Sequence, residues 1–334
     1  MIAISIRNVQ QALVEGAHQM RAHGVSDDSR NGAVVAFPGV WVTEYHNPTE
    51  RVLLDPDRDA NPFFHLFETL WMLAGRNDVK FPTLFNSKFA QFSDDGQTYH
   101  GAYGHRWRRH FGFDQIRQVA EALLENPQCR RQVLSIFDGR VDLGADTKDV
   151  PCNLMVTFQV DVNGELDMTV FNRSNDLIWG AYGSNAVHFS YLQEYVASMI
   201  GVPVGKYVQV SANTHVYQHH FDLLDKLADK APMPPQGERS CAYSRGEVKS
   251  FPLMSTPVDV WDQDLLTFME HGAFGRNYRD PFFEEVCKPL HAAWACFKDR
   301  SDPERFDNAL AAVQGCRAED WRVACKEWLQ RRNK

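Results

Sequence analysis

Length, composition and charge narrow the class of protein before any motif is considered. The chain has 334 residues, of which 44% are hydrophobic, as is typical of a globular protein with a sizeable core. A formal net charge of −8 disfavours a nucleic-acid duplex as a partner, whereas a mononucleotide held by a few arginines stays open. Seven scattered cysteines without a Cys-x-x-Cys pair predict neither a disulfide framework nor a structural zinc site. With no signal peptide and no membrane-length apolar run, we expect a cytoplasmic protein that binds no membrane.

Hydrophobic periodicity divides the chain into helices and strands. In chain order, the expected elements are a helix at 6–23, a polar loop at 26–32, strands within 33–43, and helices at 61–74 and 113–125. They continue with a strand at 132–137, a hairpin of 154–162 and 165–171 that turns at Asn163-Gly164, a helix at 186–200, a strand at 206–212 and a helix at 215–230. A loop rich in Pro, Ser and Gly at 231–257 precedes several helices from 262 onward. Because strands and helices do not alternate regularly, this order predicts an α+β fold.

A cysteine beside arginines is the first candidate for chemistry. Cys152 begins an expected strand, with Arg130 and Arg131 upstream and Arg173 downstream. Nearby guanidinium groups favour a thiolate, which is the nucleophilic form of cysteine, and they can also bind a phosphate through paired hydrogen bonds. The alternative is an ordinary buried cysteine, since most cysteines are small hydrophobic residues.

Two further segments carry possible proton donors and acceptors. Glu68 lies in an otherwise apolar helix, where burial would raise its pKa and suit it to proton transfer, unless it faces solvent. Tyr103 lies in an aromatic and basic loop at 99–109 that could bring a phenol to a reacting ring or could be a solvated turn.

Polar groups at two expected strand ends complete the list of candidates. The segments 172–176 and 179–185 could cradle a polar ring or an anion, or could be a turn with a capping serine. His215 and Tyr217 are candidates for hydrogen bonding to a ligand. His215 and His219 have the helical spacing of a zinc pair, but no further ligands complete such a site, and we expect no metal.

These segments, in this order, resemble the thymidylate synthase superfamily from about residue 30 to residue 217. The matching pieces are 68–71 with Gly75, 103–107, 126–131, Pro151-Cys152, 173–176 and 215–217. The resemblance implies a thymidylate synthase-like α+β fold, with a mixed sheet, surrounding helices and a homodimer formed through the sheet. It implies a single catalytic domain over 1–334 with a divergent helical region at about 258–334. It also implies transfer of a one-carbon unit from 5,10-methylenetetrahydrofolate to C5 of a pyrimidine nucleotide.

The same resemblance assigns roles to individual residues. Cys152 would add to C6 of the ring, which makes C5 nucleophilic. Glu68 would orient water and relay protons, and Tyr103 would assist removal of the C5 proton. Asp176 would contact the pterin. The remaining substrate contacts would be the phosphate ligands Arg173, Ser174 and Arg30, the arginines Arg130 and Arg131 from the other subunit, and His215 and Tyr217 at the sugar 3′-hydroxyl.

Departures from the family pattern bear on the base and the product. The family's base-reading Asn falls on Ser184 in an ungapped alignment, although a one-residue slip would restore it as Asn185. The usual His after the catalytic Cys is Asn153, and both changes favour cytosine. Phe89 and Phe92 stand where thymidylate synthases carry a Trp pair that shields the one-carbon unit from water, which favours a hydroxymethyl product.

The leading hypothesis is therefore a deoxycytidylate 5-hydroxymethylase of the branch known from phages that modify their DNA, acting in the host cytoplasm if the gene is phage-encoded. The segment 173–183 also resembles that branch, whereas the family's usual C-terminal tail is absent. The alternatives are C5 methylation of dCMP or dUMP, and hydroxymethylation of CMP or dUMP. From another class, a catalytically idle member could bind messenger RNA or a partner protein, and replacing Cys152 with Ala would distinguish it.

Overall fold

Two mixed β-sheets form the framework of the chain, and the computed structural model describes residues 1–231, 240–274 and 277–333. The larger sheet has the order β1-β4-β9-β7-β6-β5, with strands Ile2–Ile6, Trp41–Tyr45, Val204–Ser211, Leu166–Asn172, Asn153–Val160 and Val133–Ser135. The smaller sheet has the order β2-β3-β10-β8, with strands Val25–Ser29, Gly32–Phe37, Thr214–Tyr217 and Asn175–Asp176. Both sheets combine parallel and antiparallel pairs, as the α+β prediction requires.

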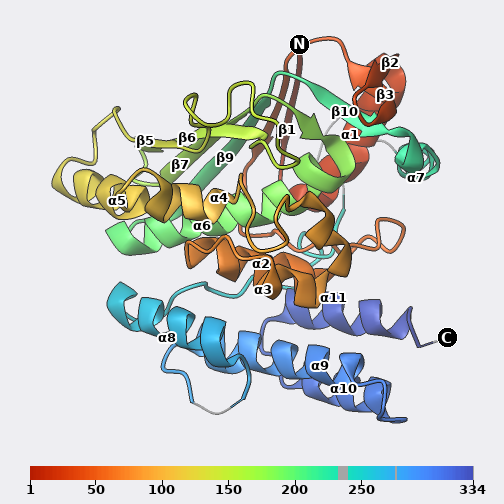
Figure 1. Cartoon of the computed structure of the whole chain (residues 1–334), viewed down its shortest axis with the longest axis vertical. Helices are drawn as coiled ribbons and strands as arrows, with labels where there is room; N and C mark the ends of the chain where they lie inside the picture. Colours follow the sequence, from red (N-terminus) through yellow and green to blue (C-terminus); the bar gives the residue numbers. More distant parts are fainter. Residues whose placement is uncertain (232–239, 275–276, 334) are drawn as a thin grey trace.

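Helices cover the larger sheet in successive layers (Figure 1). The first part of the chain contributes α1 (Val9–His23), α2 (Pro62–Leu73), α3 (Lys80–Phe85), η1 (Ser87–Phe92), α4 (Tyr103–His105), η2 (Arg106–His110) and α5 (Gln115–Glu125). The middle contributes η3 (Leu177–Ser184), α6 (Asn185–Ile200), η4 (Gln218–His220) and α7 (Phe221–Ala228). The last part contributes α8 (Val258–His271), η5 (Phe283–Cys287), α9 (Lys288–Lys298), α10 (Arg305–Gln314) and α11 (Glu319–Gln330). Figure 1 shows α5 and α6 next to the sheet, α2 beyond them, and the C-terminal helices as the outermost layer.

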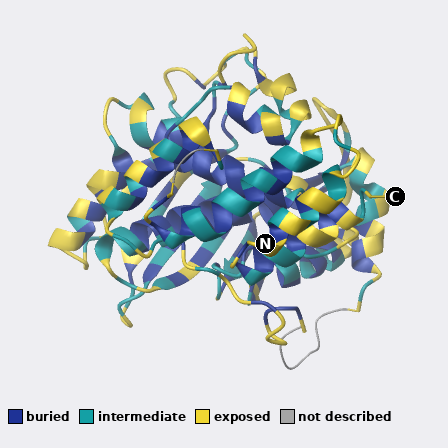
Figure 2. Cartoon of the chain, turned by 90° about the horizontal axis from the view of Figure 1, so that it is seen from below, coloured by how far each residue is buried: buried dark blue, intermediate teal, exposed yellow. Residues whose placement is uncertain are grey.

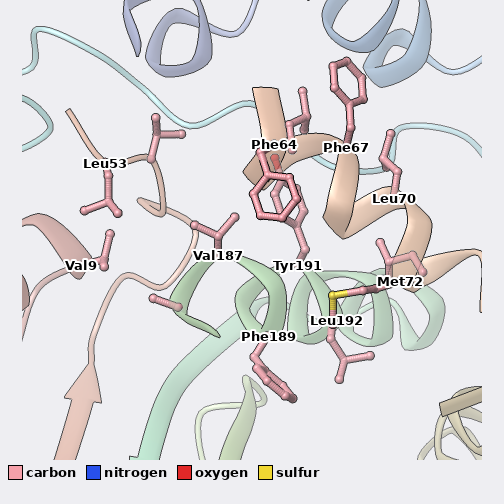
Figure 3. Packing of buried hydrophobic residues seen from close by; sticks show 14 of the residues in the cluster. Val9, Leu53, Phe64, Phe67, Leu70, Met72, Val187, Phe189, Tyr191 and Leu192 are labelled. Carbon is pink, nitrogen blue, oxygen red and sulfur yellow. The ribbon is translucent and has the colours of Figure 1, made fainter. Parts of the chain in front are cut away.

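The centre of the core lies where α2 packs between α6 and the C-terminal helices. All 12 residues of α2 are buried, and Figure 3 shows Phe64 of α2 beside Val187 and Tyr191 of α6, whereas Phe67 points away from α6 toward the C-terminal helices. Asn61 caps α2 by accepting a hydrogen bond from the backbone N–H of Phe64 at 3.2 Å. A helix so apolar needs covering on every side, which explains the additional helical layer. In Figure 2 the exposed residues lie mainly on the outer helix turns and loops.

The N-terminal elements differ from the prediction at their boundaries. The expected helix at 6–23 begins only at Val9, because the Asn8 side chain accepts from the Gln11 N–H and so marks the helix start. Residues before it form β1, which pairs in parallel with β4. The expected loop at 26–32 is mostly the fully exposed strand β2, which pairs with β3. Backbone pairing overrides the polar composition here, and that composition misled the prediction.

The second half of the chain follows the prediction more closely. The expected hairpin is formed by β6 and β7, and the turn glycine Gly164 has a φ of +83°. The expected helix at 215–230 is wrong at its start, because His215 and Tyr217 belong to β10 and α7 begins at Phe221. Part of the expected loop at 231–257 lies outside the described residues. Within the described part of the chain, we find no helix with the length and hydropathy needed to cross a membrane.

Candidate active site

Cys152 lies at the start of β6 with the Arg173 guanidinium fixed beside it. Nη2 of Arg173 lies 3.7 Å from Sγ of Cys152, and the same nitrogen donates to the Val150 carbonyl at 2.9 Å. Nε of Arg173 donates to the Pro151 carbonyl, also at 2.9 Å. The Arg173 backbone N–H donates to the Cys152 carbonyl, so β6 and β7 hold the thiol and the guanidinium in one place.

Burial and neighbouring charges have opposing effects on the pKa of the Cys152 thiol. Burial raises the pKa of Cys152, and the charges of Arg173 and Arg30 oppose that effect only in part. Asp149 adds to the rise, while its own pKa is raised by burial to about 6. Within one chain, desolvation is therefore a larger effect on the pKa of Cys152 than the charges of Arg173 and Arg30. To act as a nucleophile, the thiol would have to lose its proton.

A cavity of about 520 Å³ is lined by Arg173, the neighbour of the Cys152 thiol, and by four more of the predicted substrate residues. The five are Arg30 from the β2–β3 turn, Arg173 and Ser174 from the end of β7, and His215 and Tyr217 from β10. Asp27, Asp28 and Asp142 line the cavity as well, so its positive charge is concentrated at the two arginines. A cavity of this size and chemistry is suited to a phosphorylated ligand of nucleotide dimensions.

His215 is a hydrogen-bonding group at the cavity wall. Its Nδ1 lies 2.8 Å from Oδ1 of Asn213, and its ring meets that of Tyr217 edge to face at 4.8 Å. Burial lowers the pKa of His215, with the charge of Asp176 opposing the shift. Because His215 is in β10 and His219 in η4, the helical spacing that suggested a zinc pair is not present. The described ranges contain no group of three or more His, Cys, Asp or Glu residues that could hold a metal ion.

The phenol of Tyr103 and the carboxamide of Asn153 lie close to Cys152. The Tyr103 hydroxyl is within hydrogen-bonding reach of the Asn153 side chain and the Cys152 backbone, and burial raises its pKa. Asn153 is fully buried, and its Nδ2 donates to Oδ1 of Asn185 at 3.4 Å. The predicted residues Cys152, Asn153, Tyr103 and Asn185 are thus contiguous.

Ser184 and Asn185 differ in their hydrogen bonding. Ser184 ends the π-helical segment Leu177–Ser184, which has a non-helical backbone at Tyr182 and Gly183, and Asn185 begins α6. The carboxamide of Asn185 reaches Asn153, whereas the buried Ser184 hydroxyl has no hydrogen-bond partner among the described residues.

Glu68 is buried rather than solvent-facing, and it meets a histidine that the sequence reasoning missed. Oε2 of Glu68 lies 3.2 Å from Nε2 of His188, and both side chains are less than a tenth exposed. His188 lies one helical turn after Asn185 on α6, so the two face the same side. That spacing from the candidate base reader was the available signal. Neither paired atom has a well-aligned hydrogen bond among the described groups, which marks this as a place for a bound water or ligand.

Asp176, at the end of β8, and the exposed indole of Trp179 lie close together in the chain and form a second group of polar and aromatic side chains. Oδ1 of Asp176 accepts from the backbone N–H groups of Ile178 and Trp179 at 2.8 and 2.9 Å. The guanidinium of Arg58 lies 5.5 Å from the Trp179 ring and donates to the Ile178 carbonyl. Trp179 is 41% exposed, so a planar ring could stack here beside a carboxylate acceptor. These groups fit the pterin of a folate.

A family model described as thymidylate synthase matches residues 43–278, more than two thirds of the chain. The chain belongs to the thymidylate synthase family. It is a folate-dependent one-carbon transferase of the hydroxymethylase-like branch. The match extends well past residue 217, so the limit expected for the resemblance is too short.

Three phage proteins named deoxyuridylate hydroxymethyltransferase are among the similar proteins. That of Pseudomonas phage M6 is 52% identical over 334 residues, covering 99% of this chain and 95% of the phage M6 protein. That of Bacillus phage SP01 is 42% identical over 185 residues, covering 52% of this chain and 48% of the relative. That of Delftia phage PhiW-14 is 26% identical over 284 residues, covering 80% and 78%.

Phe89, the expected substitute for a thymidylate synthase tryptophan, packs within an aromatic cluster. Its ring lies 5.0 Å from Tyr99, 5.2 Å from Phe64 and 5.6 Å from Phe92. Burial raises the pKa of Tyr99, and the charge of Glu68 adds to the rise, so the cluster adjoins the carboxylate. A contact of Phe89 with folate stays a prediction.

Arg130 and Arg131 lie apart from the other predicted phosphate ligands. Both are exposed in the segment between α5 and β5, and neither lines the cavity of its own chain. For a thymidylate synthase family member this position suits arginines that reach into a second subunit. That role stays a prediction.

The last described helical turn, after α11, lies beside the neighbour of Arg58. Arg331 and Arg332 both pair with the carboxylate of Asp59, the neighbour of Arg58. The Arg332 guanidinium also stacks over Trp328 at 3.6 Å. The last described residues are therefore held by Asp59, next in the chain to Arg58, whose guanidinium lies near the Trp179 ring.

Proposed function

We propose that this thymidylate synthase family member hydroxymethylates C5 of dUMP, using 5,10-methylenetetrahydrofolate and water and releasing tetrahydrofolate. The observation that carries the proposal is the position of the Cys152 thiol, which lies 3.7 Å from the guanidinium of the cavity residue Arg173 and next in the chain to Asn153, the hydrogen-bond partner of Asn185. The name of the relative from Pseudomonas phage M6, which covers almost the whole chain, supports the same reaction. We assign the reaction to one catalytic domain that spans the chain and acts as a homodimer.

Uracil is favoured over the cytosine of the initial hypothesis by the position of Asn185. The preference for dCMP depended on Ser184 in place of the base-reading Asn and on Asn153 in place of the usual His. Asn185 instead presents a buried carboxamide next to Asn153, and such a group can accept from N3–H and donate to O4 of uracil. The dUMP alternative is therefore the better fit, and dCMP is kept as an arm of the test.

The residues around Cys152 would bind and activate the nucleotide. Arg173, Arg30 and Ser174 would hold the phosphate, and His215 with Tyr217 would hold the sugar. The Cys152 sulfur would add to C6, so that C5 becomes nucleophilic, and Tyr103 would help to remove the C5 proton. The folate supplies one carbon at the oxidation level of formaldehyde.

Glu68 and His188 would hold the water that completes the product. Both groups are buried, 3.2 Å apart and poorly satisfied, which suits an ordered water between them. Addition of this water to the new one-carbon substituent gives a hydroxymethyl group and needs no hydride. The balanced reaction consumes one water and leaves tetrahydrofolate, whereas methylation would leave dihydrofolate.

The test uses the purified full chain with methylenetetrahydrofolate and, in separate reactions, dUMP, dCMP and CMP. Mass spectrometry of the nucleotides should show 5-hydroxymethyl-dUMP, without the absorbance rise of dihydrofolate. A methyl product with that rise would replace the proposal with methylation. Turnover of dCMP alone would move the proposal to cytosine, and turnover of none of the three would end it.

A further inference from the structure

We propose that Gln209 and Asn175 are positioning residues that fix the direction of the Asn185 carboxamide and thereby the choice of pyrimidine base. The inference rests on the proposed function for the identity of the preferred base. It goes further by assigning base selectivity to two residues that need not touch the nucleotide. Gln209, Asn175 and Asn185 form a buried chain of three amides, which we call the amide relay, and each is at most 9% exposed.

The relay is anchored at a group that can only accept. Nε2 of Gln209 donates to the backbone carbonyl of Ala181 at 2.9 Å and to the hydroxyl of Tyr45 at 3.1 Å. The Tyr45 hydroxyl in turn donates to the same carbonyl. Because a carbonyl oxygen has no proton to give, the amino end of Gln209 must face Ala181. The Oε1 of Gln209 is thereby directed toward Asn175.

Asn175 links the fixed amide of Gln209 to the amide of Asn185. Its Nδ2 donates to Oε1 of Gln209 at 3.2 Å and to Oγ of Ser211 at 3.1 Å, so both of its N–H groups are used. Rotating the Asn175 amide would place its oxygen against the oxygen of Gln209 in a buried site, which is costly. Oδ1 of Asn175 therefore faces Asn185.

Asn185 is the last member of the relay and lies next to Asn153, the chain neighbour of Cys152. Its Nδ2 donates to Oδ1 of Asn175 at 3.0 Å, and its Oδ1 accepts from Nδ2 of Asn153 at 3.4 Å. One N–H and one lone pair of Asn185 stay free for a base edge. Gly180 makes the pairing possible, because a Cβ there would lie 2.6 Å from the accepting oxygen of Asn175.

A carboxamide with a fixed direction can tell uracil from cytosine. Uracil offers a donor at N3 and an acceptor at C4, and cytosine offers the reverse. Cys152 determines where C6 sits, so the order of donor and acceptor along the base edge is also determined. An amide free to rotate would pair with either base, whereas a fixed one leaves donors and acceptors of the wrong base unmatched. The relay is the structural reason for a single base preference.

Two substitutions at one position isolate the relay. Asn175→Leu removes the acceptor for Asn185, while Asn175→Asp keeps an acceptor there; both lose the hydrogen bond to Gln209. We expect the ratio of kcat/KM for dUMP to kcat/KM for dCMP to fall at least about tenfold in Asn175→Leu and to stay within about threefold of the wild type in Asn175→Asp. An unchanged ratio in Asn175→Leu, with both activities lowered together, would show that Asn175 only supports the fold.

Gln209→Met provides an independent test if Asn175→Leu does not fold. It removes the anchor, so the ratio should fall in the same direction. The matched control is Gln193→Met, because Gln193 is equally buried but donates only to backbone carbonyls of Leu166, Gly205 and Lys206. Loss of selectivity in both Met variants, or in neither, would overturn the relay. A wild type that prefers dCMP would overturn the proposed substrate alone, because the relay variants should then relax that preference instead.

Discussion

The nucleotide side of the active site and the helical side behind α2 are held together by different forces. On the nucleotide side, buried amides and a guanidinium are fixed by directed hydrogen bonds, as in the relay and at Arg173. On the helical side, Phe67 stacks between Phe85 at 4.5 Å and Phe268 at 5.7 Å. Directed contacts specify orientation, whereas ring packing contributes mainly burial. Changes on the first side should therefore alter rates and selectivity, and changes on the second should alter stability.

The largest effect should come from Cys152→Ala on the nucleotide side. Losing the attacking sulfur should lower kcat by at least about ten-thousandfold, since no other described group can form the bond to C6. The melting temperature should hardly change, because the small half-buried side chain contributes little burial. Rapid-quench product assays would measure the rate. Retained turnover would mean that another nucleophile acts, and the contrast between the two sides would lose its main example.

Phe67→Ala tests the opposite side. Phe67 is fully buried, and truncating such a ring in a packed core costs about 3–5 kcal/mol of the free energy of unfolding. Urea titration should show this loss, while KM for dUMP at a permissive temperature should stay near that of the wild type. A changed base preference with unchanged stability would contradict the division between the two sides.

The sequence predicted the nucleotide side better than the helical side, because motifs there carry chemistry. Cys152, Arg173 and Tyr103 could be recognised by residue type and order, and the structure brings them together. His188 was missed, because a histidine in an apolar helix looks like any core residue until Glu68 is seen beside it. Asn175 was noticed only as part of a polar cluster.

The orientation of the site side chains could not be predicted from the order and spacing of residues in the sequence. Spacing alone left Ser184 and Asn185 both open, and only the folded chain shows that the Asn185 carboxamide contacts Asn153 while the Ser184 hydroxyl has no partner among the described residues. The direction of the Asn185 amide depends on Gln209, which is 24 positions further along the chain and comes from β9. Such long-range hydrogen bonds arise only when the sheet has formed.

Asp320 gives the helical side a predictable pH dependence. Burial raises the pKa of its carboxyl from 3.8 to about 6, and its Oδ2 accepts from the Tyr243 hydroxyl at 2.9 Å. The raised pKa means that the folded state binds the proton more tightly than the unfolded state. This contribution therefore stabilises the fold fully below pH 4 and is lost as the pH rises to about 6.

Asp320→Asn measures the size of that contribution. Relative to wild type, the variant should gain about 3 kcal/mol in unfolding free energy between pH 4 and pH 7, because its side chain does not ionise. Urea titrations at several pH values would show this, with kcat unchanged at pH 7. If the difference in unfolding free energy between Asp320→Asn and wild type did not change between pH 4 and pH 7, the pKa of Asp320 would not be raised, and the charged carboxylate would be better solvated than its burial indicates.

The smallest expected effect is that of His188→Gln, which tests where the nucleotide side ends and the helical side begins. His188 lies on α6, where the aromatic packing ends and the polar site begins. In His188→Gln we expect kcat for the hydroxymethyl product to fall about tenfold to a hundredfold, because Glu68 would lose the partner that we propose helps to hold the attacking water. The KM for dUMP should change little, since the phosphate and sugar contacts lie elsewhere.

His291→Gln is the matched control on the helical side. The His291 ring packs against Phe67 and Phe268, and burial lowers its pKa to about 4, so it is neutral at physiological pH. Its loss should lower the melting temperature and leave kcat unchanged. If both histidine variants lost only stability, His188 would belong to the core, and the water would depend on Glu68 without a partner. If His188→Gln lowered kcat and also released a methyl product, the Glu68–His188 pair would be what separates hydroxymethylation from methylation.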